Sequence, residues 1–205
     1  IAYNPIFDYI EFLEKETVWD CRIIFADGSE MKCHKLILAN SSKFFFNAFT
    51  GDMAEQSTGI VQIQFNPENL LQKVIRWMYN GDIKYDDKSL MQLYAVVHFY
   101  GIEVLKADVE KKINEVVNDE NVLEYANSCY EMDLQESLNA LAPIIGKNIL
   151  NHDVNKLSEI LDVRVYSLAI KESGLSDEAK LKNMKEFLGD YELNEDEKQM
   201  LRDSL

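Results

Sequence analysis

Cysteine and histidine are scarce in this sequence, and their spacing excludes two kinds of site. The three cysteines, Cys21, Cys33 and Cys129, are odd in number and lie far apart along the chain. This usage is typical of free thiols in a reducing compartment rather than of a disulfide framework. We therefore expect an intracellular protein, in the cytoplasm, the nucleus or both. The sequence holds no CxxC motif and its three histidines are isolated from one another, so we expect no metal site.

Basic residues and long apolar runs are also in short supply. Asp and Glu outnumber Lys and Arg by 36 to 21, giving a net charge of −15. This charge repels phosphate backbones and predicts no nucleic-acid partner. The longest apolar stretches are far too short to span a bilayer, so we expect no membrane segment. Residues 1–9 carry no basic leader, which predicts no secretory signal, and the opening Ile1 in place of Met favours a fragment of a longer protein.

The sequence lacks any recognisable catalytic constellation. We find no nucleophile paired with a base and oxyanion donors, no phosphate-binding loop and no paired carboxylate site, which predicts a protein that is not an enzyme and needs no cofactor. Apolar residues make up 47% of the 205 residues and charged residues 28%. That composition is typical of a globular chain long enough for one large domain or two small ones.

The first elements predicted from the pattern are a helix and a β-hairpin. Residues 4–16 predict a helix with Asn4 as its cap and Pro5 in its first turn. Its broad apolar face must be buried against something, and comprises Ile6, Phe7, Ile10 and Leu13. Residues 19–34 predict a hairpin, because the dipeptide Asp27-Gly28 favours a tight type I′ turn. The first strand places three side chains on one apolar face: Cys21, Ile23 and Phe25.

The following residues predict two short helices within 34–51, separated by a break at 40–42. Ser41 or Ser42 would cap the second helix, and Gly51 would end it. Three consecutive phenylalanines lie in the second helix. Two of them, Phe44 and Phe46, cannot share the face of Phe45 and Phe49, so at least one is exposed or covered by another element.

The rest of the chain predicts one more strand and then only helices. Residues 59–65 alternate between apolar and polar side chains, which is typical of a half-buried strand. Three helices are expected next, bounded by Asn, Pro and Gly signals: 66–81, 86–101 and 103–118. From Asn118 onward the pattern suits successive helices, with Pro143 either kinking one or marking a boundary. Residues 174–205 have weak periodicity.

Four segments, in the right order, resemble the BTB/POZ family. They are WDCRIIFADGSEMKCHKLILANSSKFF, FNAFTGDMAE, VIRWMYNGDI and LMQLYAVVHFYGIEVLKADVEKKI. The segment NVLEYANSCYEMDLQESLNALAPIIGKNI then resembles the first two helices of a BACK domain. The resemblance implies an α+β BTB/POZ fold, a small three-stranded sheet with flanking helices, over residues 1–116. An all-α BACK-like region would follow over residues 117–205.

The resemblance also implies a function in protein–protein interaction. Many such proteins are dimeric substrate adaptors of cullin-three RING ubiquitin ligases. Their BTB unit binds the cullin, and here the substrate would be held by a region outside this chain. One alternative is a homodimeric scaffold of transcriptional or cytoskeletal assemblies that binds no cullin. Another is a monomeric adaptor similar to Skp or elongin C, although the N-terminal helix and the helical annex argue against it.

The resemblance places a cullin-binding site at the end of the phenylalanine helix. Met53-Ala54-Glu55 matches the apolar-x-Glu motif of cullin-binding members. Methionine adapts its shape to a partner groove, and a carboxylate two residues later can accept hydrogen bonds from the partner. The alternative is a methionine that covers the core beside a solvated glutamate. The predicted cullin-binding residues are Met53, Glu55, Phe46, Phe49, His98 and Tyr100.

The resemblance places a dimer interface at the N-terminal helix. Family members pack this helix across a two-fold axis and keep charges near the dimer centre. The predicted interface residues are Ile6, Phe7, Ile10, Leu13, Asp20, His34 and Lys35. The alternative is that the apolar face of the helix packs within its own subunit.

Overall fold

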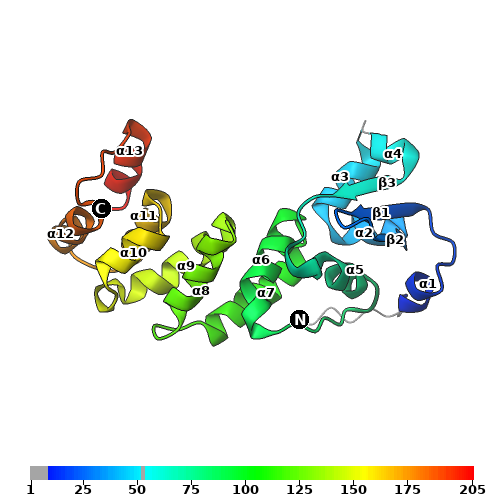
Figure 1. Ribbon diagram of the computed structural model, residues 1–205, viewed down its shortest axis with the longest axis horizontal. Helices are drawn as coiled ribbons and strands as arrows, with labels where there is room; N and C mark the ends of the chain where they lie inside the picture. Colours follow the sequence, from blue (N-terminus) through cyan, green and yellow to red (C-terminus); the bar gives the residue numbers. More distant parts are fainter. Residues whose placement is uncertain (1–8, 52–53) are drawn as a thin grey trace. The chain divides into compact units, whose positions relative to one another are not determined.

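The computed structural model describes residues 9–51 and 54–205 and divides the chain into two compact units, Ile1–Glu110 and Lys111–Leu205 (Figure 1). The first unit contains a three-stranded sheet with helices around it. The second unit contains helices and no strand. This arrangement confirms the predicted fold class, a small sheet with flanking helices followed by an all-helical region.

The sheet of the first unit has β1 at its centre. Its strands are β1 (Cys21–Phe25), β2 (Glu30–Cys33) and β3 (Ile60–Ile63), in the order β2-β1-β3. β2 runs antiparallel to β1, and β3 runs parallel to it. The side chains of Cys21, Ile23 and Phe25 are all buried, as their alternation predicts. The hairpin and the third strand are therefore both confirmed.

The hairpin turn differs from the predicted type I′ turn, which needs a positive φ at both central residues. Of Asp27 and Gly28, only Gly28 has a positive φ, at 83°. The Gly28 amide donates to the Phe25 carbonyl at 2.9 Å, and the Phe25 amide donates to the Ser29 carbonyl at 2.9 Å. The loop therefore has three residues and ends in a glycine bulge. The Asp27 carboxylate stabilises it by accepting hydrogen bonds from the amide and hydroxyl of Ser29.

Seven α-helices complete the described part of the first unit and lead into the second. They are α1 (Ile10–Glu14), α2 (Lys35–Ser41), α3 (Lys43–Thr50), α4 (Ala54–Thr58), α5 (Leu70–Asn80), α6 (Leu90–Phe99) and α7 (Glu103–Val116). Three-residue 3₁₀ turns precede α5 and α6, at Pro67–Asn69 and Asp87–Ser89. The predicted break between α2 and α3 is confirmed at Ser42. Its hydroxyl accepts from the Phe45 amide at 3.2 Å and donates to the Tyr100 carbonyl at 2.6 Å.

At two helix boundaries the cause in the structure differs from the cause that the sequence predicts. Gly51 follows α3, but its φ of −81° is open to any residue, so no glycine is needed there. The predicted helix over 66–81 begins only at Leu70, because Glu68 and Asn69 have φ values of 51° and 55°. Asn66 still caps the helix from a distance, since its side-chain oxygen accepts from the Leu71 amide at 2.9 Å.

The second unit is built from six α-helices. They are α8 (Val122–Glu131), α9 (Gln135–Lys147), α10 (Val154–Ile160), α11 (Val163–Lys171), α12 (Asp177–Leu188) and α13 (Glu195–Asp203). Pro143 lies inside α9, so it marks no boundary. The weakly periodic residues 174–205 form α12 and α13, and both are defined by side-chain caps: Ser176 accepts from the Ala179 amide, and Asn194 forms a capping box with Glu197.

Over residues 9–51 and 54–205, no helix is both long enough and apolar enough to cross a membrane. Within the same residues, no three His, Cys, Asp or Glu side chains lie close enough together to hold a metal ion.

The three cysteines predict how stability depends on pH. All three are free and buried, and burial raises the pKa of both Cys33 and Cys129 from 9.0 to about 12. Burial raises the pKa of Cys21 as well. Because the unfolded chain ionises first, each thiol leaves stability unchanged below pH ~9 and lowers it by about 1.4 kcal/mol per pH unit above it.

We expect the free energy of unfolding, measured in urea, to fall steeply as the pH rises from 9 to 11. Cys129→Ala removes one of the three thiols, so the free energy of unfolding of this variant should fall less steeply with pH than that of the parent chain. Equal slopes for the two chains would contradict this account.

Candidate protein-interaction surfaces

The most prominent apolar surface of the first unit lies beside α1 and α2. We call it the α1–α2 face, and it consists of the exposed side chains of Tyr9, Phe12, Val18, Trp19 and Leu36. Val18 is 77% and Leu36 80% exposed. All but Trp19 line a hollow of about 550 Å³. If each side chain exposes on the order of 100 Å², the face reaches ~500 Å², which is near the upper end of what a monomer leaves uncovered.

The helix periods explain why these residues point outward. α1 packs on α5 through the buried side chain of Leu13, so Phe12, one residue earlier, is turned toward solvent. The Tyr9 amide donates to the Tyr79 carbonyl at 3.1 Å, which fixes the start of α1. In α2, Leu38 is buried and Leu36, about 200° away around the helix, is exposed.

The segment between α1 and β1 presents Val18 in a strained conformation. Val18 has a φ of 49°, a region that costs a β-branched residue on the order of 1–3 kcal/mol. Interactions on either side hold it there. The carbonyl of Thr17 accepts from His34 Nε2 at 2.8 Å, and Lys32 Nζ lies 2.6 Å from Glu16 and 5.6 Å above the Trp19 ring. Val18 is therefore kept on the surface by its surroundings.

The predicted charged interface residues have structural roles within the subunit. An Asp20 carboxylate oxygen accepts from the Lys35 amide at 2.7 Å, which caps α2 because His34, its N-cap residue, offers no side-chain cap. His34 Nδ1 accepts from the Tyr79 hydroxyl at 2.9 Å, so its Nε2 carries the proton donated to Thr17. Asp20 and His34 line the hollow.

Lys35 is turned toward α4 instead. Its Nζ donates to the Gln56 carbonyl at 2.9 Å and lies 5.6 Å above the Phe49 ring. It is not among the residues that line the hollow, and this placement argues against Lys35 as an interface residue.

The apolar residues predicted for the dimer interface are corrected in part. Ile6 and Phe7 lie outside the described residues. Leu13 is buried inside its own subunit and cannot contact a partner, and Ile10 is half-buried. The α1–α2 face was not predicted, because Phe12 lies outside the apolar stripe expected for the N-terminal helix. The exposed leucine beside a buried one in α2 was a signal that could have found it.

The residues predicted to bind a cullin stay a prediction, and they differ in exposure where the structure describes them. Met53 lies outside the described residues. Glu55 is half-buried in the first turn of α4, and Phe46 is 53% exposed. Phe49 and Tyr100 are buried, and Tyr100 keeps only 1% of its surface exposed, so neither can contact a partner directly. The prediction that at least one of Phe44 and Phe46 is exposed is confirmed by Phe46.

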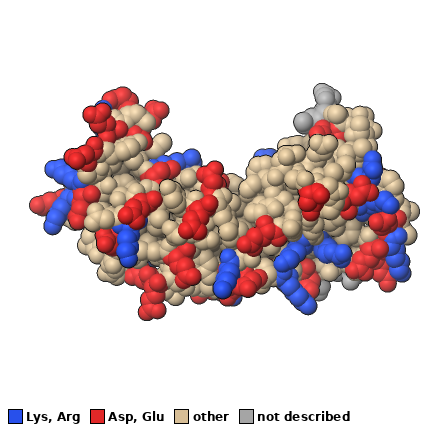
Figure 2. Space-filling view, in the orientation of Figure 1, with Lys and Arg blue, Asp and Glu red and all other residues tan. Residues whose placement is uncertain are grey.

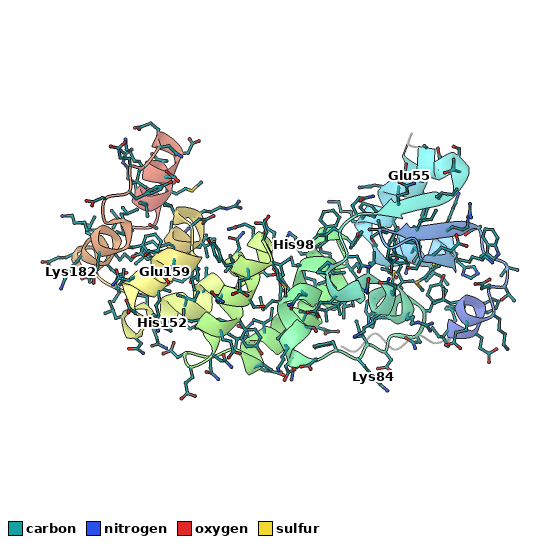
Figure 3. The ribbon with its side chains drawn as sticks, viewed as in Figure 1. Glu55, Lys84, His98, His152, Glu159 and Lys182 are labelled. Atoms are coloured by element: carbon teal, nitrogen blue, oxygen red, sulfur yellow. The ribbon has the colours of Figure 1, made fainter. Side chains whose placement is uncertain are left out.

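Tyr100 instead ties the end of α6 to the segment after β3. Its hydroxyl donates to the Phe65 carbonyl at 2.6 Å, and burial raises its pKa, so the group remains a donor. The neighbouring Phe99 is the exposed aromatic residue, packed 4.9 Å from the Phe65 ring and 6.3 Å from the Phe44 ring. His98 is half-buried on α6, and Figure 3 shows it and Glu55 in the first unit.

Phe46 lies beside a second hollow of the first unit. This groove has a volume of about 330 Å³ and is also lined by Trp77, Val104 and the ends of α2 and α3. Gly101 also lines this groove and packs so closely on Lys43 that a Cβ atom at position 101 would come within 2.9 Å of Lys43 Cβ. The exposed aromatic ring and the apolar wall together can hold a partner's side chain.

Comparison with known proteins shows similarity to proteins that carry a Kelch repeat. The chain is 25% identical over 137 residues to Kelch repeat protein M-T8 of Myxoma virus (strain Lausanne), covering 67% of this chain and 26% of that protein. It is 27% identical over 126 residues to the human Kelch repeat and BTB domain-containing protein 2, covering 59% and 20%. The human Kelch repeat and BTB domain-containing protein 4 is 27% identical over 112 residues, covering 55% and 21%.

The chain therefore spans about a fifth to a quarter of the length of these curated relatives. Its first half matches a protein-family model, that of the BTB/POZ domain, over residues 9–116. The matched range contains the three-stranded sheet, α1 to α7 and both surfaces described above. The chain belongs to the BTB/POZ domain family.

Proposed function

We propose that this protein-interaction module is a dimeric substrate adaptor of a cullin-three RING ubiquitin ligase. Its first unit would pair with a second copy and bind the cullin. A substrate protein would be held by a region outside this chain. We further propose that residues 117–205, which include α8 to α13, form a BACK-like helical domain. The sequence resemblance and the purely helical composition of the second unit support this domain assignment.

The α1–α2 face is the observation that carries the dimeric part of the proposal. It offers two aromatic anchors, Tyr9 and Phe12, around a hollow into which a leucine such as Leu36 of another copy can insert. A two-fold axis makes the same patch serve both subunits, so each residue contributes twice. The strained Val18 supports an intermolecular role, since exposing an apolar side chain at a cost in strain gains nothing in a monomer.

The cullin-binding part rests on the resemblance and on the position of Glu55. The motif Met53-Ala54-Glu55 follows α3 by two residues in the sequence, and Glu55 is the second residue of α4, a short helix without buried residues. Its carboxylate lies in the first turn of this helix and is half-buried rather than enclosed. The exposed Phe46 of the preceding helix offers an apolar contact on the same unit.

We expect the double variant Met53→Ala and Glu55→Ala to bind the cullin-three N-terminal domain at least ~30-fold more weakly, a loss of about 2 kcal/mol. The reason is that the variant removes an adaptable apolar contact and its adjacent acceptor together. Titration calorimetry would measure the affinity. Glu131→Ala with Met132→Ala, the same two residue types at exposed positions of the second unit, serves as the control. Unchanged affinity with an intact fold would remove the site assignment.

A scaffold that pairs with itself and binds no cullin is the competing function. It shares the α1–α2 face, so dimerisation does not distinguish the two. A stable dimer with no detectable binding of the cullin domain by the parent chain would favour the scaffold.

A further inference from the structure

The second unit has an apolar groove between α12 and α13 that the proposed function does not use. Its volume is about 230 Å³. The apolar side chains that line it are Leu181, Met184, Leu188, Leu193, Leu201 and Leu205. Leu181 is 44% exposed at one edge, whereas Met184 and Leu201 are buried at the floor. The groove is therefore lined by leucine-rich surface that solvent can reach.

A buried lysine holds the two walls of this groove together. Lys180 on α12 keeps only 8% of its surface exposed. Its Nζ donates to the Ser204 carbonyl at 2.8 Å and to the Leu205 carbonyl at 3.4 Å, at the end of α13. A cation there also interacts favourably with the helix dipole. Because both helices also begin with side-chain caps, the groove is formed before any partner binds.

The rim of the groove is basic in a chain that is strongly acidic overall. Four cations line it or the adjoining hollow on α12, and only one carboxylate, that of Glu178, does so. The cations are Lys182, Lys185, Lys198 and Arg202. The chain as a whole carries a net charge of −15, so this excess of cations runs against its composition.

Two of these cations are available to a partner. Lys182 and Lys185 are exposed and have no hydrogen-bond or ion-pair partner within the described parts of the chain. Lys198 is already paired with Glu195 at 2.6 Å, and Arg202 makes a long contact of 3.5 Å with Gln199. Figure 3 labels Lys182 on α12, and Figure 2 shows blue side chains at that edge of the second unit, where acidic side chains otherwise dominate the visible face.

We propose that the α12–α13 groove binds an acidic amphipathic helix of a partner protein. Leucine-type side chains at positions i, i+3 or i+4, and i+7 of that helix would fill the apolar floor. Carboxylates flanking this stripe would meet Lys185 and Arg202 on the two walls. Charge complementarity selects this occupant, because a basic helix would be repelled by the cations of the rim and an uncharged one would leave Lys182 and Lys185 without a partner.

The test uses the whole 205-residue chain and two synthetic helical peptides that share the leucine stripe. One peptide carries glutamates beside the stripe and the other carries lysines. We expect the parent chain to bind the glutamate peptide saturably at low salt, as measured by fluorescence anisotropy. The double variant Lys185→Glu and Arg202→Glu should bind the same peptide at least ~10-fold more weakly. The control variant, Lys156→Glu with Lys171→Glu, reverses two exposed lysines elsewhere in the second unit and should bind like the parent.

Three results would overturn the proposal. They are no saturable binding of the glutamate peptide, equal binding of both peptides, and an equal loss of affinity in the control variant. A second copy as the occupant is tested separately with Leu181→Asp. If this variant lowers the mass of the chain in light scattering while its urea midpoint is unchanged, the groove holds another copy of this chain and not a partner helix.

Discussion

Leu36→Asp is expected to convert the proposed dimer of this chain to a monomer. Leu36 is the most exposed large apolar residue of the α1–α2 face. In a two-fold dimer the change buries two carboxylates in the interface, where unpaired charges are strongly unfavourable. We expect the dimer dissociation constant to rise at least ~100-fold, which corresponds to about 2.7 kcal/mol. Analytical ultracentrifugation over a dilution series would measure it.

The control is Leu150→Asp, which places the same charge at another exposed leucine, 62% accessible, in the second unit. It should leave the dissociation constant unchanged. Both leucines are exposed, so neither variant should alter the urea midpoint of the monomer. If Leu36→Asp remained as dimeric as Leu150→Asp, the α1–α2 face would not be the dimer interface.

Gly146→Val is expected to destabilise the second unit by about 3 kcal/mol or more. Gly146 lies in α9 where that helix crosses α11 at close range. A side chain at this position would overlap the Ala169 carbonyl and meet the Glu172 Cβ at 3.2 Å. Because the first obstacle is backbone, it cannot move aside as a side-chain tip could, and the two helices must separate.

Its matched control is Lys147→Val, which introduces the same β-branched residue one position later on the exposed side of α9. The two variants then differ little in their effect on helix propensity, so the close approach of α9 and α11 at Gly146 remains the main difference between them. Urea unfolding followed by circular dichroism would give both free energies. An equal loss for the two variants would show that the helices are not in contact at Gly146.

Much of the fold could be predicted from local signals. The alternation around Ile23 and Val61 gives β1 and β3, and Ser42 separates α2 from α3 by capping the second of them. These signals act over a few residues, so a single sequence shows them. The tail was the least predictable part: the caps of α12 and α13 are local signals, but the packing of the two helices depends on long-range contacts such as that of Lys180 with Ser204, which leave no periodicity in the sequence.

The candidate sites were less predictable than the fold. The apolar face and the resemblance assigned Leu13 to an interface, with packing inside the subunit as the alternative, and the packing of α1 on α5 buries Leu13 within its own subunit. Tyr100 was predicted to be one of the cullin-binding residues, which requires it to be exposed. The structure buries Tyr100 and exposes Phe99 instead, a choice made by the Phe65 carbonyl that accepts from Tyr100. Such choices depend on partners distant in sequence.

The proposed function is tested most directly by the mass of a complex between this chain and the cullin-three N-terminal domain. Light scattering on the purified mixture would give that mass. The account predicts an assembly of two copies of the chain with two cullin domains. A dimer of the chain that leaves the cullin domain free, or one chain bound to one cullin domain at concentrations where the chain alone should pair, would contradict it.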